Sequence, residues 1–183
     1  MEPFTASMQH SEQSIRQLSK VQYNTFQLGW KIMQAVCALL LIWLGLSHAV
    51  GIWQGICVFT GCWLFINMDT PAKLRADKVI DSMKGRFPFT RYSFTLSGIQ
   101  MEASGEITGI SYSALIRLVE DDRYFYLYIS KLSAYMIDKK TAQPDPNHVR
   151  KRIENGSGLR FTRVTTLLNF NLRTLFANRR KSR

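Results

Sequence analysis

Charged residues are absent from one long stretch of the chain. The 37 residues from Ile32 to Met68 include no Asp, Glu, Lys or Arg, although these types make up 20% of the sequence. A charge at the bilayer centre costs about 3 kcal/mol on insertion scales, so such a stretch is typical of membrane-spanning segments. We therefore expect a membrane protein. The alternative is a helical hairpin buried in a soluble core.

Motifs that carry chemistry are absent as well. The sequence has no Walker loop, no Gly-x-Gly-x-x-Gly, no Gly-x-Ser-x-Gly and no His-Glu-x-x-His. His10, His48 and His148 lie in three separate regions, and the three cysteines all fall inside the apolar stretch at spacings typical of no zinc or redox motif. We therefore predict that the chain is no enzyme and holds no cofactor, no metal and no disulfide framework.

The apolar stretch is too long for a single crossing. As one helix it would extend about 55 Å, against a hydrocarbon core of about 30 Å. The polar and small residues at 47–51 interrupt it and predict two legs, Lys31–Ser47 and Val50–Met68. We therefore assign residues 31–68 to a transmembrane helical hairpin.

The flanks of the hairpin predict its orientation. Basic residues stand before the first leg and after the second, whereas the connection between the legs contains no Lys or Arg. Basic flanks stay on the cytoplasmic side. We therefore expect a multi-pass protein of the plasma membrane with both termini in the cytoplasm.

Positive charge is concentrated outside the central part of the chain. The formal net charge is +11, and residues 150–183 alone contribute +9, whereas residues 92–149 carry −2. A basic residue near an anionic membrane surface contributes about 1 kcal/mol. Nucleic acid is the rival partner, but the bilayer is within reach and no nucleic-acid motif is present. The candidate contacts with anionic headgroups are Lys73, Arg75, Lys78, Arg160, Arg163, Arg173, Arg179, Arg180 and Lys181.

The C-terminal tail has an amphipathic pattern. Its apolar residues recur at steps of three and four, at Phe161, Val164, Leu168, Leu172 and Leu175. This spacing predicts a helix that lies on the membrane surface or in a groove of the domain. A terminal helix packed on the protein's own core is the alternative.

Alternating apolar and polar residues predict a small, mostly β domain after the hairpin. A short helix follows Pro144-Asp-Pro146 and ends near Asn155-Gly156. Before the hairpin, Ser11 is expected to cap a helix over 12–20, and 4–9 is expected to be a strand of the later sheet. The strands are expected at 92–96, 99–103, 107–110, up to Val119, 124–129 and 132–137.

Four tyrosines of this domain are candidates for a recognition face that binds a peptide or a lipid. They are Tyr112, Tyr124, Tyr126 and Tyr128. The alternative is that one half of such an alternating set belongs to the core.

We divide the chain into five parts on this basis. They are a cytoplasmic strand and helix (1–30), the hairpin (31–68), a basic linker (69–91), a cytoplasmic β domain with a short helix (92–157) and a basic amphipathic tail (158–183).

Several segments resemble the YcxB-like family of bacterial membrane proteins. They are 92–101 (YSFTLSGIQM), 110–120 (ISYSALIRLVE), 124–129 (YFYLYI) and 134–140 (AYMIDKK), and the similarity extends over 7–153. It implies two transmembrane helices and a small cytoplasmic β domain, similar in outline to pleckstrin-homology-like folds. We therefore expect a transmembrane hairpin followed by an antiparallel β domain of this kind with a C-terminal helix. Asp138 stands where the family often has proline, and the basic segment after Gly158 is an addition. The family has no established catalytic residues, so none is carried over.

We therefore expect an α+β protein of the bacterial inner membrane. Its cytoplasmic domain is expected to bind a protein or lipid partner at the membrane face, for toxin immunity or for regulation of a neighbouring protein. The alternative is a structural subunit of a transport or envelope complex that acts through the hairpin. The expected partners are the lipid bilayer, a protein and a second copy of the chain, rather than nucleic acid.

Overall fold

The first strand of the chain pairs with a strand on the far side of the apolar stretch. In the computed structural model, which describes residues 4–48, 50–103 and 105–164, β1 (Phe4–Gln9) runs antiparallel to β2 (Phe89–Phe94). The register pairs Phe4 with Phe94 and Gln9 with Phe89. The predicted strand at 4–9 is thereby confirmed, and everything between 10 and 88 is an insertion between two paired strands.

Two four-stranded sheets form the body. The first has the order β1-β2-β3-β4, and the second has the order β7-β6-β5-β8 with β8 parallel to β5. The elements not yet given are β3 (Gly98–Ala103), β4 (Glu106–Ser111), β5 (Arg117–Glu120), β6 (Tyr124–Tyr128), β7 (Ala134–Asp138), β8 (Thr162–Arg163) and the short helices η1 (Tyr112–Ala114) and η2 (Lys139–Thr141). Each predicted strand is present with shifts of a few residues at its ends.

Local signals set the ends of the helix that follows β7. In α5 (Pro146–Ser157), the Asp145 side chain accepts a hydrogen bond from the backbone N–H of Asn147, and Pro146 occupies the first turn. Gly158 ends the helix with φ 69°, a left-handed conformation that favours glycine. The predicted helix is confirmed.

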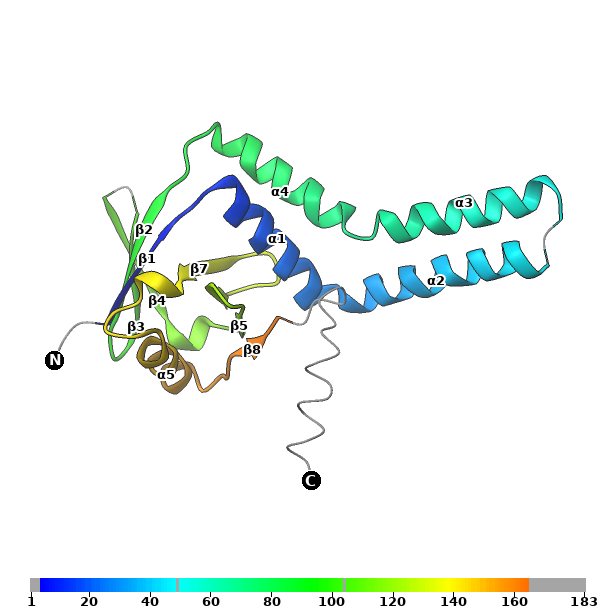
Figure 1. Cartoon of the computed structure of the whole chain (residues 1–183). Coiled ribbons are helices and arrows are strands. Elements are labelled where there is room, and N and C mark those ends of the chain that lie inside the picture. Colours follow the sequence, from blue (N-terminus) through cyan, green and yellow to red (C-terminus); the bar gives the residue numbers. More distant parts are fainter. Residues whose placement is uncertain (1–3, 49, 104, 165–183) are drawn as a thin grey trace, which may run out of the picture.

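Four helices make up the insertion between β1 and β2. They are α1 (Glu12–Phe26), α2 (Leu28–Ser47), α3 (Ile52–Ile66) and α4 (Thr70–Met83). Ser11 and Ser14 form a capping box, in which each hydroxyl accepts the other residue's backbone N–H at 3.2 and 2.9 Å. The predicted cap is confirmed, and α1 continues to Phe26. In Figure 1, α2 and α3 project together away from the sheets, while α1 and α4 connect them to the body.

The segment expected to be a basic linker contains a helix. Within 69–91, α4 occupies fourteen residues before β2 begins. The residues that α4 buries are Ala72 and Ala76, while Leu74 and Val79 are exposed. Small buried residues give a weak apolar periodicity, so the sequence pattern did not indicate this helix.

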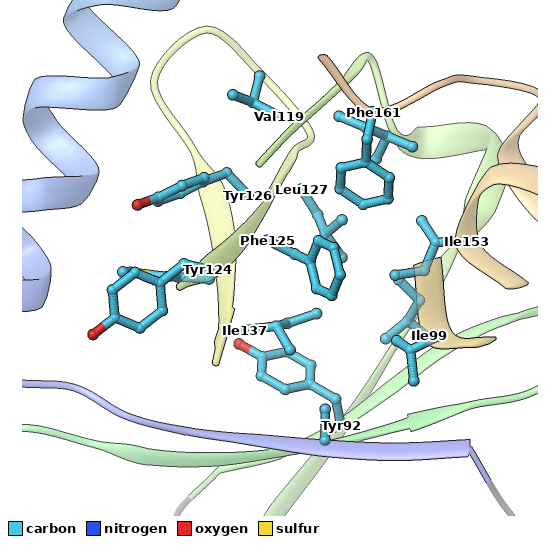
Figure 2. Packing of buried hydrophobic residues seen from close by; sticks show 14 of the residues in the cluster. Tyr92, Ile99, Val119, Tyr124, Phe125, Tyr126, Leu127, Ile137, Ile153 and Phe161 are labelled. Carbon is cyan, nitrogen blue, oxygen red and sulfur yellow. The ribbon is translucent and has the colours of Figure 1, made fainter. Parts of the chain in front are cut away.

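The aromatic strand β6 is buried on both faces. All five of its residues are buried. Figure 2 shows Phe125 and Leu127 directed toward Ile153 of α5 and Phe161, whereas Tyr124 and Tyr126 point to the opposite side. On that side Gln17 of α1 donates to Asp121, which also accepts the hydroxyl of Tyr126. The helix α1 therefore covers the second face of the strand.

This coverage corrects the expected recognition face. Tyr112, Tyr124, Tyr126 and Tyr128 are 3%, 7%, 0% and 0% exposed, so they belong to the core. The alternation of Tyr124, Tyr126 and Tyr128 suggested one solvent-facing side, but α1, which precedes the apolar stretch, covers that side, while Tyr112 packs against α5. Burial and the neighbouring Asp121 carboxylate raise the pKa of Tyr126, which keeps its hydroxyl protonated as a donor.

The start of the tail differs from the predicted amphipathic helix. Phe161 is buried with its ring centroid 4.9 Å from that of Phe125, and Thr162–Arg163 form β8. Thus the tail begins as an extended segment, which packs on the core as the alternative predicted but is not the helix that both interpretations predicted. The remaining tail predictions, including the helix beyond Val164 and the cations Arg173, Arg179, Arg180 and Lys181, lie outside the described residues.

We expect Ile153→Ala to destabilise the body. Ile153 is fully buried under β6, and truncation of such a residue costs about 2–5 kcal/mol through lost burial and a cavity. Leu132→Ala is the matched control, because Leu132 is 75% exposed, and its effect is expected within about 0.5 kcal/mol. Chemical denaturation of the detergent-solubilised chain measures both. Equal effects of the two substitutions would contradict the described core.

Candidate membrane-facing surface

The helical hairpin α2–α3 exposes most of its apolar side chains. Only 17% of the most apolar 18-residue stretch of α2 is buried. Trp43, Phe59 and Trp63 are 56%, 69% and 59% exposed. Contiguous exposed apolar surfaces of this kind mark contacts with a membrane or another protein. Within the described residues, the hairpin is therefore no buried core element, contrary to the soluble alternative.

The two legs differ in length. The helix α2 has 20 residues and is the one described helix long and apolar enough to cross a membrane. The second leg, expected over Val50–Met68, is a helix over Ile52–Ile66 only, about 22 Å long. It begins late because Gly51 adopts φ 66° before it, and it ends where the chain turns toward α4.

Small residues allow the legs to pack closely. A Cβ added to Gly61 would lie 2.7 Å from the carbonyl oxygen of Ala38, and one added to Gly45 would lie 2.8 Å from a methyl of Val58. The side-chain amide of Gln34 also donates to the Leu64 carbonyl at 3.2 Å. Close backbone approach at small residues is the usual basis of helix association in membranes.

A buried ion pair closes the base of the hairpin. Lys31 is 3% exposed, and its Nζ donates to Asp69 Oδ1 at 2.6 Å and to Asn24 Oδ1 at 3.1 Å. Lys31 and Asp69 are the two charges that bound the charge-free stretch. The pair therefore joins the start of one leg to the end of the other. Sequence reasoning placed Lys31 only at the start of the first leg and missed this pairing, although the opposite charges at the two ends of the charge-free stretch indicated it.

The surroundings of this pair are also buried. Tyr23 is 1% exposed, and burial together with the Asp69 carboxylate raises the pKa of its hydroxyl. A second ion pair, Arg16 to Asp77 at 2.7 Å, joins α1 to α4, with both side chains about half exposed. Together these contacts attach the hairpin to the body through α1 and α4.

The cations predicted to contact lipid headgroups lie in separate parts of the structure. Lys73, Arg75 and Lys78 are all exposed on α4. Arg160 is exposed beyond the end of α5, and Arg163 of β8 pairs with Asp122. Of the five predicted cations within the described residues, the structure therefore brings three together on α4, next to the base of the hairpin.

The acidic turn between β5 and β6 is occupied by protein groups. Glu120 pairs with Lys139 at 2.8 Å and with Arg150 at 3.3 Å. One oxygen of Asp121 accepts the backbone N–H groups of Arg123 and Tyr124. Within the described part of the chain, no group of three or more potential ligands is placed to hold a metal.

A family model matches part of this body. The model described as YcxB-like protein matches residues 94–146. The resemblance is confirmed over this segment, which runs from the end of β2 to the start of α5 and includes none of the hairpin. Neither a curated protein nor a solved structure matches the chain.

We expect Gly61→Ala to destabilise the hairpin by about 1–3 kcal/mol, because its methyl group meets backbone of the other leg. Gly55→Ala in the same helix is the matched control. A Cβ at Gly55 meets nothing within 4 Å, so we expect no loss of stability there. Thermal unfolding in detergent compares the two variants, and an equal response would argue against the described leg-to-leg packing.

We expect Asp69→Asn to cost about 3–5 kcal/mol, because it leaves the Lys31 ammonium buried without its counter-charge. Lys31→Met is expected to cost less, since the Asp69 side chain keeps 22% exposure and partial hydration. Asp77→Asn, in the exposed pair with Arg16, serves as control at about 0–1 kcal/mol. Denaturant titration gives all three values, and a reversed order would contradict the buried pair.

Proposed function

We propose that the chain is a membrane-anchored interaction protein. In this proposal α2 and α3 form a transmembrane hairpin, and the two-sheet body lies on the cytoplasmic side of a bacterial inner membrane. The body, similar in outline to pleckstrin-homology-like folds, holds a protein or lipid partner at the membrane face. Toxin immunity and regulation of a neighbouring membrane protein both fit this role, which requires binding rather than catalysis.

One observation carries the proposal. The apolar hairpin leaves from one paired strand and returns to the other, with its base closed by the Lys31–Asp69 pair. Both ends of an inserted hairpin must therefore lie on the side of the body. Three exposed cations of α4, Lys73, Arg75 and Lys78, stand near this base and suit anionic headgroups.

The helix α3 is short for a membrane crossing, so this arrangement requires that the bilayer and the residues near its ends compensate. Its 15 residues span about 22 Å, short of a hydrocarbon core of about 30 Å. A short hydrophobic segment is accommodated by local thinning of the bilayer at modest cost. Trp53 and Trp63, both exposed near the ends of α3, suit the two interfaces.

Cysteine labelling tests the topology. In a variant with Cys37, Cys57 and Cys62 replaced by alanine, we expect His48→Cys to react with an impermeant maleimide from outside intact cells. Gln13→Cys and Lys151→Cys, both at exposed body positions, are expected to react only after permeabilisation. Labelling of either body position from outside, or extraction of the chain by alkaline wash, would refute the proposal.

Photo-crosslinking compares the body with the hairpin as the partner surface. A crosslinker at Ile107, which is 74% exposed on β4, samples the body, and one at Phe59, 69% exposed on α3, samples the hairpin. We expect a protein adduct from Ile107 in native membranes and lipid adducts from Phe59. A protein adduct from Phe59 alone would instead support the structural subunit of a transport or envelope complex.

A further inference from the structure

A small pocket opens at the base of the hairpin. It has a volume of about 200 Å³, and its lining includes Leu28, Val119 and Val164 together with Arg117 and Arg163. Leu28 is the first residue of α2, one helical turn before the buried Lys31. The pocket therefore lies where the body meets the start of the apolar hairpin.

The charge of this pocket suits an anion. No Asp or Glu belongs to its lining among the described residues. The exposed Arg117 is held by a hydrogen bond from Nη1 to the Thr25 carbonyl at 3.3 Å and by the ring of Phe26, 5.8 Å away. A guanidinium carries five N–H donors in a planar fork that matches phosphate oxygens. Arg163 also pairs with Asp122 and so contributes less net charge.

The apolar part of the pocket continues along α2. Leu28, Ile32, Val36 and Leu40 follow one another at steps of four, so they lie in one row on the helix, and they are 37%, 46%, 50% and 52% exposed. A ligand seated at Arg117 therefore meets a polar end inside the pocket and an apolar track leading away from the body. This is the pattern of a phospholipid, with one charged group and long acyl chains.

A buried amide adds to the polar end. Asn24 belongs to the pocket lining and is 7% exposed. Its Oδ1 accepts from Lys31, whereas its Nδ2 is buried without a partner among the described residues. Buried donors are normally paired with a protein group or with water. An acceptor held in this pocket, directly or through a bridging water, completes the pairing of Asn24.

We propose that this pocket binds the phosphate of one anionic phospholipid, whose acyl chains lie along the Leu28 row of α2. This site specifies a lipid partner for the proposed function. It rests on that proposal, because the acyl chains can lie along α2 only when the hairpin is in the bilayer. It assigns Arg117 as the residue that selects an anionic headgroup over a neutral one.

Native mass spectrometry of the full chain in an uncharged detergent tests the site. The probes are short-chain phosphatidylglycerol and phosphatidylcholine in equal amounts. We expect one phosphatidylglycerol to be retained preferentially. Arg117→Gln should weaken its binding about fivefold, the ratio that corresponds to the ~1 kcal/mol of one basic residue near an anionic surface. Arg117→Lys keeps the charge and should retain most of the preference.

Two further variants distinguish lipid binding in the pocket from a general effect of positive surface charge. Val164→Trp fills the space without changing the charge and should also release the lipid. Arg91→Gln removes an exposed arginine from the first sheet, where it pairs with Glu102, and should leave lipid retention unchanged. Equal loss from Arg91→Gln would overturn the site.

The remaining outcomes distinguish the ligand and the anchoring. Equal retention of the two lipids, or unchanged binding by Arg117→Gln, would overturn the inference. Displacement of the lipid by millimolar inorganic phosphate would assign the pocket to a soluble anion and overturn the lipid source. Failure of the anchoring proposal appears separately, as release of the full chain from membranes by alkaline wash.

Discussion

The pairing of β1 with β2 is the constraint on which the whole arrangement depends. It joins two strands separated by four helices and fixes them in an antiparallel register from Phe4–Phe94 to Gln9–Phe89. A chain segment that begins and ends at neighbouring strands must return to its starting point. The helices α1 and α4 therefore flank one another, and the apolar legs between them form a hairpin with a common base rather than two separate elements.

The two ion pairs at the base of this hairpin differ in how strongly they constrain its attachment to the body. The exposed Arg16–Asp77 pair contributes little because water competes with it. The Lys31–Asp69 pair is nearly dry at the lysine end, so each partner depends on the other being in place. The Lys31–Asp69 pair also lies between the body, whose core contains packed aromatic residues, and the hairpin, whose apolar helix surface is exposed.

Sequence reasoning succeeded where the signal was local. The alternation at 92–103, the aromatic strand at 124–128 and the Ser11 cap each lie within a few residues, and the structure contains all of them. It failed where the deciding partner was distant in sequence. The tyrosines of β6 are buried because α1 covers them, α4 packs through small alanines that give no periodic pattern, and Phe161 meets Phe125 across the body. The pocket at Arg117 is lined by residues of α1, α2, β5 and β8, so no contiguous sequence pattern predicts it.

The placement of the insertion also orders events during synthesis. The ribosome completes β1 before any of the helices, and β2 only after α4 has emerged. The first sheet therefore stays open until the second leg and α4 have returned the chain to β1. A chain whose second leg fails to pack against the first leaves β1 and β2 unpaired, and such open edge strands are accessible to proteases and to aggregation.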